Sequence, residues 1–234
     1  MATTQARIAS IARHDSGVRL ISLSLSAPFG FDAGQYLYVV HPGGARIPMS
    51  IASAPQHLPE LDLHFRPLPG IADAALMSDI VDRETAIGST LVVDGPFGDV
   101  RVGGPLDDDL WLFAGGSGIS QCLSIAEHLR GVGQTRLVRL VWSVTQTDQL
   151  YCDATLRRFA RWLEYTPLVD SPDTPNAAVA WLDDSRPALS GRIIISGGPG
   201  FVYALVDALE RVGVGDATIE SDVFAYAPRQ KGPA

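Results

Sequence analysis

The hydrophobic pattern of the chain changes near residue 105, and this change restricts the fold more than any other feature of the sequence. In the first part, apolar and polar residues alternate over residues 18–25. Alternation with a period of two is typical of half-buried β-strands. The other stretches with this pattern are residues 35–40, 61–65 and 90–93. Gly- and Pro-rich segments separate the stretches, which predicts an antiparallel β-barrel with one helix within residues 71–81.

In the second part, strands are expected to alternate with helices. Residues 110–114 form a continuous apolar run, as expected for a parallel strand that is buried on both faces. Further strands are expected at residues 137–142, 165–169, 192–196 and 217–220, and helices at residues 119–129, 149–163 and 200–212. This order predicts an α/β domain with a doubly wound parallel sheet. A polar segment at residues 103–109 separates the two parts, so we predict domains over residues 1–104 and 105–234.

Composition and charge exclude several classes of protein. The 234 residues suit two domains, and 46% of them are hydrophobic, which predicts folded cores. The net charge is −8 and no basic stripe is visible, so neither a nucleic acid nor an anionic membrane surface is expected as a partner. No run of about 18 apolar residues is present, and the first residues lack the apolar core of a signal peptide. We expect a soluble, cytoplasmic protein without a membrane span.

Metal chemistry is not expected. Cys122 and Cys152 are the only cysteines, too few for a zinc site or an iron–sulfur cluster, and the five histidines lack metal-ligand spacing. Cys122 lies on an apolar helix face and is predicted to be a core thiol.

Two glycine-rich turns follow predicted strands of the second part. The first is Gly115-Gly116-Ser117-Gly118, between a strand and a helix, and the second is Gly197-Gly198-Pro199. Glycines let a ligand approach the backbone, and a helix N-terminus offers free N–H groups to a pyrophosphate. Because both turns follow strands of one parallel sheet, we expect them to lie close together at one edge. Ordinary turn chemistry is the alternative for each loop alone.

Further motifs complete a recognisable order. The first part contains Gly-Gln-Tyr-Leu at residues 34–37, Arg-Ile-Pro-Met-Ser-Ile-Ala-Ser at residues 46–53 and Gly-Pro-Phe-Gly at residues 95–98. The second part adds Leu150-Tyr151 and Ser-Asp-Val-Phe-Ala-Tyr at residues 221–226. Together with the two glycine-rich turns, these motifs resemble those of the ferredoxin–NADP reductase superfamily, and specifically its stand-alone flavin reductases.

The resemblance implies a flavin-binding barrel followed by a nicotinamide-nucleotide domain. It implies a catalytic role for Ser50, whose hydroxyl would lie near flavin N5, and a structural role for Ser53. The remaining residues implied to contact flavin or nucleotide are Arg46, Pro48, Met49, Gly115, Gly116, Ser117, Gly118, Gly197, Gly198, Pro199, Phe224 and Tyr226. Of these, Phe224 or Tyr226 would cover the flavin face and move aside for the nicotinamide.

The sequence departs from the family pattern at three positions. The arginine that lies three residues before the serine is replaced by Ile47, and Arg46 stands one residue earlier. Because side chains on a strand alternate faces, this shift turns Arg46 away from the site unless residues 41–45 bend the strand entry. The aromatic position is Met49, which covers a ring without stacking on it, with core packing as the alternative. The cysteine position is Gly197, which is tolerable because the cofactors carry the hydride chemistry.

These departures predict that FAD or FMN binds weakly and is used as an exchangeable substrate. The segment of residues 142–148 has no basic residue and ends in Asp148, which would repel a 2′-phosphate, so NADH is favoured over NADPH. Our leading hypothesis is an NAD(P)H-dependent flavin reductase that delivers reduced flavin to a partner such as a monooxygenase. One alternative is an FAD-holding reductase that passes electrons to a separate ferredoxin, iron–sulfur or haem protein. Another is a redox-inactive regulatory or interaction module.

Overall fold

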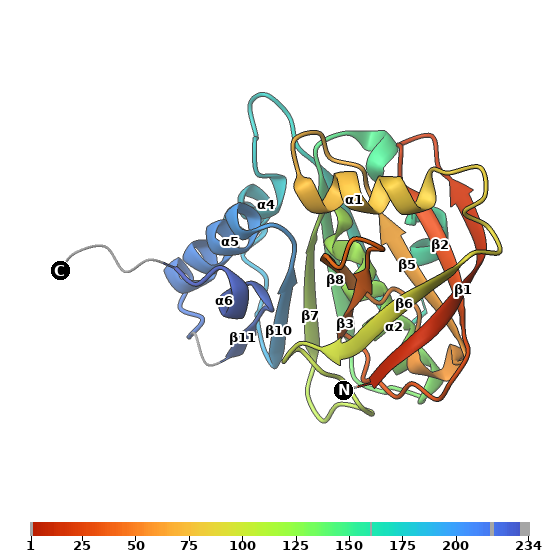
Figure 1. Ribbon diagram of the computed structural model, residues 1–234. Coiled ribbons are helices and arrows are strands. Elements are labelled where there is room, and N and C mark those ends of the chain that lie inside the picture. Colours follow the sequence, from red (N-terminus) through yellow and green to blue (C-terminus); the bar gives the residue numbers. More distant parts are fainter. Residues whose placement is uncertain (1, 160, 216–217, 230–234) are drawn as a thin grey trace. The chain divides into compact units, whose positions relative to one another are not determined.

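The chain forms two compact units in a computed structural model that describes residues 2–159, 161–215 and 218–229 (Figure 1). The first unit comprises residues up to Gly104 together with Leu123–Val132, and the second comprises Pro105–Cys122 and the chain from Gly133 onward. The two-domain class predicted from the sequence is confirmed.

The first unit contains a six-stranded antiparallel sheet in the order β4-β3-β6-β1-β2-β5. Its strands are β1 (Ala2–Arg13), β2 (Arg19–Leu25), β3 (Tyr36–Val40), β4 (Arg46–Ser50), β5 (Glu60–Phe65) and β6 (Thr90–Phe97). A bridge between Ile51, directly after β4, and Leu63 within β5 links the two outer strands, so the sheet curls into a barrel. Helix α1 (Ala72–Val81) contributes Met77 and Ile80 to the core, and a 3-10 turn, η1 (Pro55–His57), follows β4.

Alternation of side chains explains this core. Along β3, Leu37 and Val39 are fully buried while Tyr36 and Tyr38 point to the other face. The same alternation holds on β2 and β5, where Leu23 pairs with Leu61 in the interior. The antiparallel barrel is therefore confirmed, although β1, which pairs with both β2 and β6, was not predicted.

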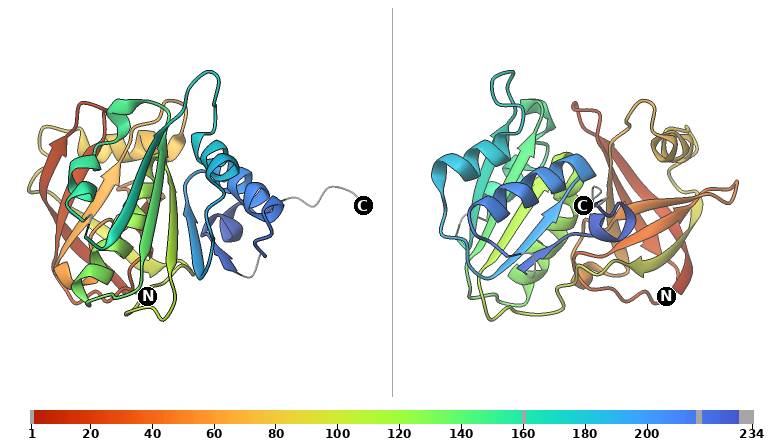
Figure 2. Two further views of the ribbon diagram at one scale, coloured as in Figure 1. Left: turned by 180° about the vertical axis from the view of Figure 1, so that it is seen from behind. Right: turned by 90° about the vertical axis from the view of Figure 1, so that its left-hand side faces the viewer.

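The second unit contains a five-stranded parallel sheet in the order β11-β10-β7-β8-β9. Its strands are β7 (Leu110–Gly115), β8 (Val138–Val144), β9 (Leu163–Val169), β10 (Arg192–Ser196) and β11 (Ile219–Glu220). The helical segments are η2 (Gly116–Gly118), α2 (Ile119–Gly131), η3 (Thr147–Gln149), α3 (Asp153–Arg157), α4 (Ala177–Ser185), α5 (Pro199–Arg211) and α6 (Val223–Tyr226). Helices α4 and α5 cover one face of the sheet, opposite the start of α2 (Figure 2). This is the predicted doubly wound arrangement.

Two helix predictions need correction. The helix expected over residues 149–163 is only α3, and β9 already begins at Leu163. Hydrophobic residues at helical spacing are present, but Phe159 and Trp162 pack in a turn after the short helix. Aromatic residues have low helix propensity, so the spacing alone does not carry a helix through this segment. Helix α4 was not predicted, although Asn176 caps it by accepting a hydrogen bond from the Val179 amide at 3.2 Å.

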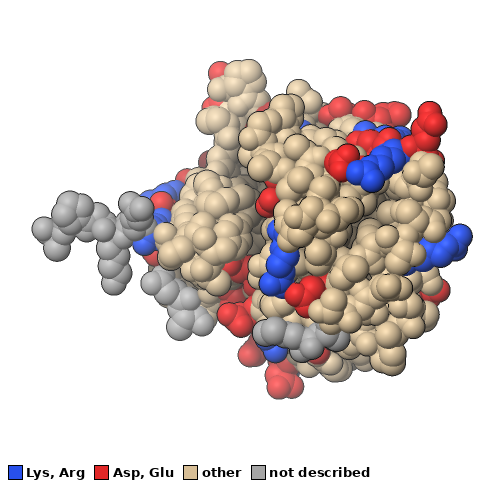
Figure 3. Space-filling model, in the orientation of Figure 1, with Lys and Arg blue, Asp and Glu red and all other residues tan. Residues whose placement is uncertain are grey.

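No helix among the described residues is long and apolar enough to cross a membrane. On the face drawn in Figure 3, basic residues occur singly among acidic ones and form no continuous basic patch. Cys122 and Cys152 are both buried and unbonded to each other, and burial raises the pKa of the Cys122 thiol to about 12. The prediction that Cys122 is a core thiol is confirmed.

Candidate active site

Strand β4 presents its residues to two different environments. Ile47 and Met49 point into the barrel core, where they are 2% and 8% exposed. Arg46, Pro48 and Ser50 therefore lie together on the outer face. Arg46 shares a face with Ser50 without any bend at the strand entry, because the two are four residues apart. Met49 belongs to the core, so the alternative of core packing holds for it and Pro48 takes the outer position.

A group of half-buried aromatic side chains lies beside this outer face. Tyr36 and Tyr38 pair across the sheet with Ser50 and Pro48, and Tyr36 also pairs with Phe97. The Tyr38 and Phe97 ring centroids are 5.1 Å apart, and those of Tyr36 and Phe97 are 5.9 Å apart. We call Tyr36, Tyr38 and Phe97 the aromatic platform. Such rings on the surface of a barrel suit stacking of a flat heterocycle.

Arg46 lies over this platform and is already paired. Its guanidinium carbon is 4.2 Å from the centroid of Tyr38 and 5.3 Å from that of Phe97. Its Nη2 donates to a carboxylate oxygen of Asp94 on β6 at 2.5 Å. A cation over an aromatic face is held by the ring quadrupole, and a guanidinium–carboxylate contact is the stronger kind of hydrogen bond.

Hydrogen bonds within the first unit hold the segment after β4 in place. The Ser53 hydroxyl accepts from the Asp62 amide at 3.0 Å, and the Ser53 carbonyl accepts from the Ser124 hydroxyl on α2 at 2.7 Å. Gln56 on η1 contacts the ring of His128 at 3.0 Å. Both of these α2 residues lie in the part of the helix that belongs to the first unit. The structural role expected for Ser53 agrees with these contacts, and Ser50 is the half-exposed hydroxyl on the outer face.

In the second unit, the two glycine-rich loops touch each other. A Cβ on Gly118 would lie 2.2 Å from the carbonyl oxygen of Ser196 and 2.8 Å from the amide nitrogen of Gly197. A Cβ on Gly197 would meet Gly115 and the ring of Phe201, and one on Gly115 would meet the same ring. The expected proximity of the loops is present, and Gly115, Gly118 and Gly197 are required for close packing.

Other glycines of these loops face open space. A Cβ on Gly116, Gly198 or Gly200 would meet nothing within 4 Å. Gly116 has a φ of +54°, and its carbonyl accepts from the Trp142 indole at 2.9 Å. Gly198 precedes α5 without a side-chain cap, and Pro199 starts that helix. The backbone here is accessible to a ligand, and the first amides of α5 lack intrahelical acceptors.

The C-terminal segment packs within the second unit. Asp222 accepts from the Gln121 amide at the start of α2 at 2.8 Å. The Tyr203 hydroxyl on α5 donates to the Ala227 carbonyl at 2.7 Å, and the rings of Tyr203 and Phe224 are 6.0 Å apart. Phe224 is 36% exposed and Tyr226 is 65% exposed. Their expected role over the flavin face stays a prediction.

Acidic residues follow β8 and β9, the two strands that lie on the same side of β7 in the sheet. The segment after β8 ends in the exposed Asp148, and the segment after β9 begins with Asp170. Asp170 accepts from the Ser143 hydroxyl at 3.2 Å and from the Ala177 amide at 3.0 Å. These hydrogen bonds link Asp170 to β8 and to the start of α4. No basic residue occurs in residues 142–149 or 169–176.

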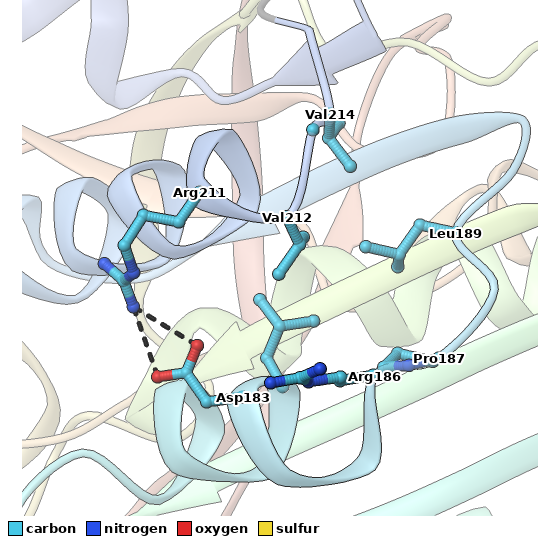
Figure 4. Close-up of a pocket in the computed structure, with 9 residues that line it drawn as sticks. Asp183, Arg186, Pro187, Leu189, Arg211, Val212 and Val214 are labelled. Carbon is cyan, nitrogen blue, oxygen red and sulfur yellow. Dashed lines mark hydrogen bonds and ion pairs between the residues drawn. The ribbon is translucent and has the colours of Figure 1, made fainter.

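A separate pocket of about 660 Å³ lies at the C-terminal ends of α4 and α5, between Leu189, Val212 and Val214 (Figure 4). Arg211 forms an ion pair with Asp183 at 3.2 Å beside it. Because α4 leads into β10 and α5 leads toward β11, this pocket lies where strands begin, at the edge opposite to the glycine-rich loops. Among the described residues, no group of three or more His, Cys, Asp or Glu is placed to hold a metal ion.

Sequence reasoning missed the aromatic platform and Asp94. The signal was present, because Tyr36 and Tyr38 alternate with buried Leu37 and Val39 on one strand. Their proximity to Phe97 and Arg46 depends on pairing between strands that are distant in sequence, which alternation does not specify.

Comparison with known proteins gives relatives of one kind. The chain is 32% identical to an NAD(P)H-flavin reductase of Vibrio harveyi over 68% of this chain and 67% of that protein. It is 30% identical to the reductase subunit of an aromatic O-demethylase of an Amycolatopsis species, over 97% of this chain and 70% of that protein. No protein-family model matches the chain.

Solved structures agree in fold. The crystal structure of an Amycolatopsis cytochrome P450 reductase has a TM-score of 0.79 at 25% identity, covering 94% of this chain and 69% of that chain. A ferredoxin–NADP⁺ reductase from Neisseria gonorrhoeae has a TM-score of 0.74 at 20% identity, covering 94% and 98%. The chain thus belongs to the ferredoxin–NADP reductase superfamily, as an oxidoreductase related to its NAD(P)H-flavin reductases.

Proposed function

We propose that the protein is an NAD(P)H-dependent flavin reductase that uses flavin as an exchangeable substrate and favours NADH. The observation that carries the proposal is the aromatic platform beside Ser50 on the outer face of the barrel. The relatives include a named NAD(P)H-flavin reductase, which supports the same reaction. The nicotinamide would supply a hydride and the flavin would accept it, so the task of the protein is to bind these two molecules and orient them.

The first unit offers the residues that would hold a flavin. Tyr36, Tyr38 and Phe97 would provide aromatic surface beside Arg46, which lies over the rings of Tyr38 and Phe97, and Pro48 adds an apolar contact on the same face. The Ser50 hydroxyl would donate a hydrogen bond to flavin N5. Loose binding follows from the small number of polar groups, because Arg46 is already engaged by Asp94.

The second unit offers the residues that would hold the nucleotide. Gly116 and Gly198 expose backbone, and the first amides of α5 suit a pyrophosphate. Asp148 and the absence of basic residues in residues 142–149 and 169–176 favour NADH, because a 2′-phosphate would meet negative charge and no cation there.

The reduced flavin would serve a partner oxygenase. Several relatives are reductase components of oxygenase systems. One of them is the reductase component of a phenol 2-monooxygenase of a Pseudomonas species. A flavin that dissociates can reach such a partner by diffusion.

The test is to mix the purified protein with NADH and riboflavin, FMN or FAD and to follow NADH oxidation. We expect oxidation that saturates with free flavin and a protein that is colourless as purified. Replacing Ser50 with Ala should lower kcat while the affinity for flavin changes little. Absence of NADH oxidation above background with all three flavins would refute the proposal.

A second function is favoured by a relative that matches nearly the whole chain. The reductase subunit of the aromatic O-demethylase aligns over 97% of the sequence. This chain would then keep its flavin and pass electrons to a separate protein. A yellow protein with stoichiometric flavin, and no stimulation by added flavin, would favour this function over the first.

A further inference from the structure

We propose that Trp142 is a positioning residue for the nicotinamide nucleotide, because its indole fixes the backbone of the glycine-rich loop of residues 115–118. The inference rests on the proposed flavin reductase function and adds a residue to the nucleotide side of that function. It is carried by the hydrogen bond that the indole N–H of Trp142 donates to the Gly116 carbonyl at 2.9 Å.

The Trp142 side chain reaches the loop from the neighbouring strand. Trp142 lies near the end of β8, where it pairs in register with Ala114 of β7, two residues before Gly116. Its side chain is fully buried, and the Tyr151 ring packs against it edge to face with ring centroids 5.5 Å apart. A ring that is packed in this way keeps one orientation, so its N–H offers a fixed donor to the loop.

Two other buried indole nitrogens make no such bond. Nε1 of Trp111 and Nε1 of Trp162 have no hydrogen-bond partner among the described residues. A buried indole N–H usually finds an acceptor. Of these three indoles, that of Trp142 is the one with an acceptor, and the acceptor belongs to the loop that the proposed function assigns to the nucleotide.

The hydrogen bond sets the direction of the peptide group that follows Gly116. The carbonyl and amide groups of a trans peptide point in opposite directions, so a carbonyl held by the indole turns the Ser117 N–H away from Trp142. Ser117 is exposed, and a Cβ on Gly116 would meet nothing within 4 Å. The Ser117 N–H is thus kept on the accessible side of the loop, where an anionic group of the nucleotide would accept from it.

The expected effect of the indole is on affinity rather than on hydride transfer. Gly116 has a φ of +54°, and a glycine loses more conformational freedom than other residues when it is ordered. A loop that is already ordered binds more tightly, because less freedom is lost on binding. The Gly116 carbonyl also accepts from the Ile119 amide, so removal of the indole weakens the restraint without abolishing it.

The experiment compares Trp142→Phe with Trp111→Phe in steady-state oxidation of NADH by free flavin. Both variants replace a buried indole by a smaller ring, but only Trp142→Phe removes a hydrogen bond. Inhibition by ADP and by adenosine is measured for each protein, because ADP carries a pyrophosphate and adenosine does not. A third protein carries benzothienylalanine at position 142, which keeps the size of the indole and lacks the N–H donor.

For Trp142→Phe we expect the KM for NADH and the inhibition constant of ADP to rise about three- to tenfold, as the loss of one hydrogen bond allows. The benzothienylalanine protein should show the same rise without loss of packing. In both proteins kcat, the KM for flavin and the inhibition constant of adenosine should stay within about twofold. Trp111→Phe should leave all of these values within about twofold, although it also removes buried volume.

An unchanged KM for NADH in the benzothienylalanine protein would overturn the inference, even if Trp142→Phe failed to fold. Equal changes in Trp142→Phe and Trp111→Phe, or a rise in the KM for flavin as large as that for NADH, would also overturn it, because lost packing would then be the cause. If the unaltered protein neither oxidised NADH nor bound ADP, the proposed function itself would fail.

Discussion

Gly118, the last residue of η2, packs against the carbonyl group of Ser196 at the end of β10, so closely that a Cβ on Gly118 would lie 2.2 Å from that oxygen. The neighbouring atoms are backbone atoms of Ser196 and Gly197, which cannot rotate away as a side chain would. The contact joins the two glycine-rich loops of the second unit.

Replacing Gly118 with Ala should therefore destabilise the protein by about 1–3 kcal/mol, the usual cost of forcing extra atoms into a packed site. The measurement is chemical denaturation followed by tryptophan fluorescence. Gly198→Ala is the matched control, because its Cβ would meet nothing within 4 Å and its φ is −69°. The control should stay within about 0.5 kcal/mol of the unaltered protein. Equal stability of both variants would contradict the packing argument.

Tyr38 should contribute to flavin binding through its ring rather than through its hydroxyl. Tyr38→Leu removes a platform ring and should raise the KM for flavin about two- to tenfold, as expected for a stacking contact. Tyr38→Phe keeps the ring and should leave the KM within about twofold. The KM for NADH should not change in either variant. Similar KM values for flavin in the Leu and Phe variants would argue against stacking at this residue.

The sequence indicated the architecture because each unit repeats one simple period. Alternation over residues 18–25 corresponds to β2 of the antiparallel barrel, and the apolar run at residues 110–114 corresponds to β7. The parallel doubly wound sheet follows from the alternation of strands and helices after β7. Apolar spacing over residues 149–163 is compatible both with one helix and with a short helix followed by a turn, and packing of Phe159 and Trp162 decides between them.

The candidate site was predicted in part. The glycine-rich loops were found because strand ends and glycines are local features, and their contact follows from the parallel order of β7 and β10. The aromatic platform was missed because Tyr38, Arg46 and Asp94 come together only through strand pairing between β3, β4 and β6. Alternation assigns a face to each side chain but does not specify which strands become neighbours.

The preference for NADH should shift when a cation replaces Asp148. This residue is exposed on η3, beyond the end of β8, so Asp148→Arg exchanges a repulsive charge for an attractive one without disturbing the core. We expect the KM for NADPH to fall about tenfold while the KM for NADH stays within about twofold. Asp148→Asn, which only removes the repulsion, should give a smaller effect in the same direction. An unchanged ratio of the two KM values would mean that the 2′-phosphate does not lie near this residue.

Cys122 should be inert in the folded protein. It is fully buried, and the burial raises its pKa to about 12, so the thiolate that reacts with alkylating agents is scarce at neutral pH. We expect no labelling of Cys122 by iodoacetamide under native conditions, full labelling in denaturant, and NADH oxidation that is insensitive to the reagent. Peptide mass spectrometry identifies the labelled cysteine. Rapid native labelling of Cys122 would show that the core around it opens readily.

His64 on β5 should make the barrel less stable in acid. Burial is the main cause that lowers the pKa of His64 from 6.5 to about 4, and the nearby Asp62 acts in the opposite direction. Because the unfolded chain binds a proton at a higher pH than the folded protein does, this histidine favours folding fully above pH 6.5. The contribution is lost as the pH falls from 6.5 to about 4.

His64→Gln should therefore weaken the dependence of unfolding free energy on pH between these two values, as measured by urea denaturation at a series of pH values. His57→Gln is the control, because the His57 side chain is 49% exposed and has no comparable burial. This control should keep the steeper dependence of the unaltered protein. If His64→Gln and His57→Gln gave the same slope as the unaltered protein, the acid sensitivity would have to arise from carboxylates rather than from the half-buried His64 imidazole.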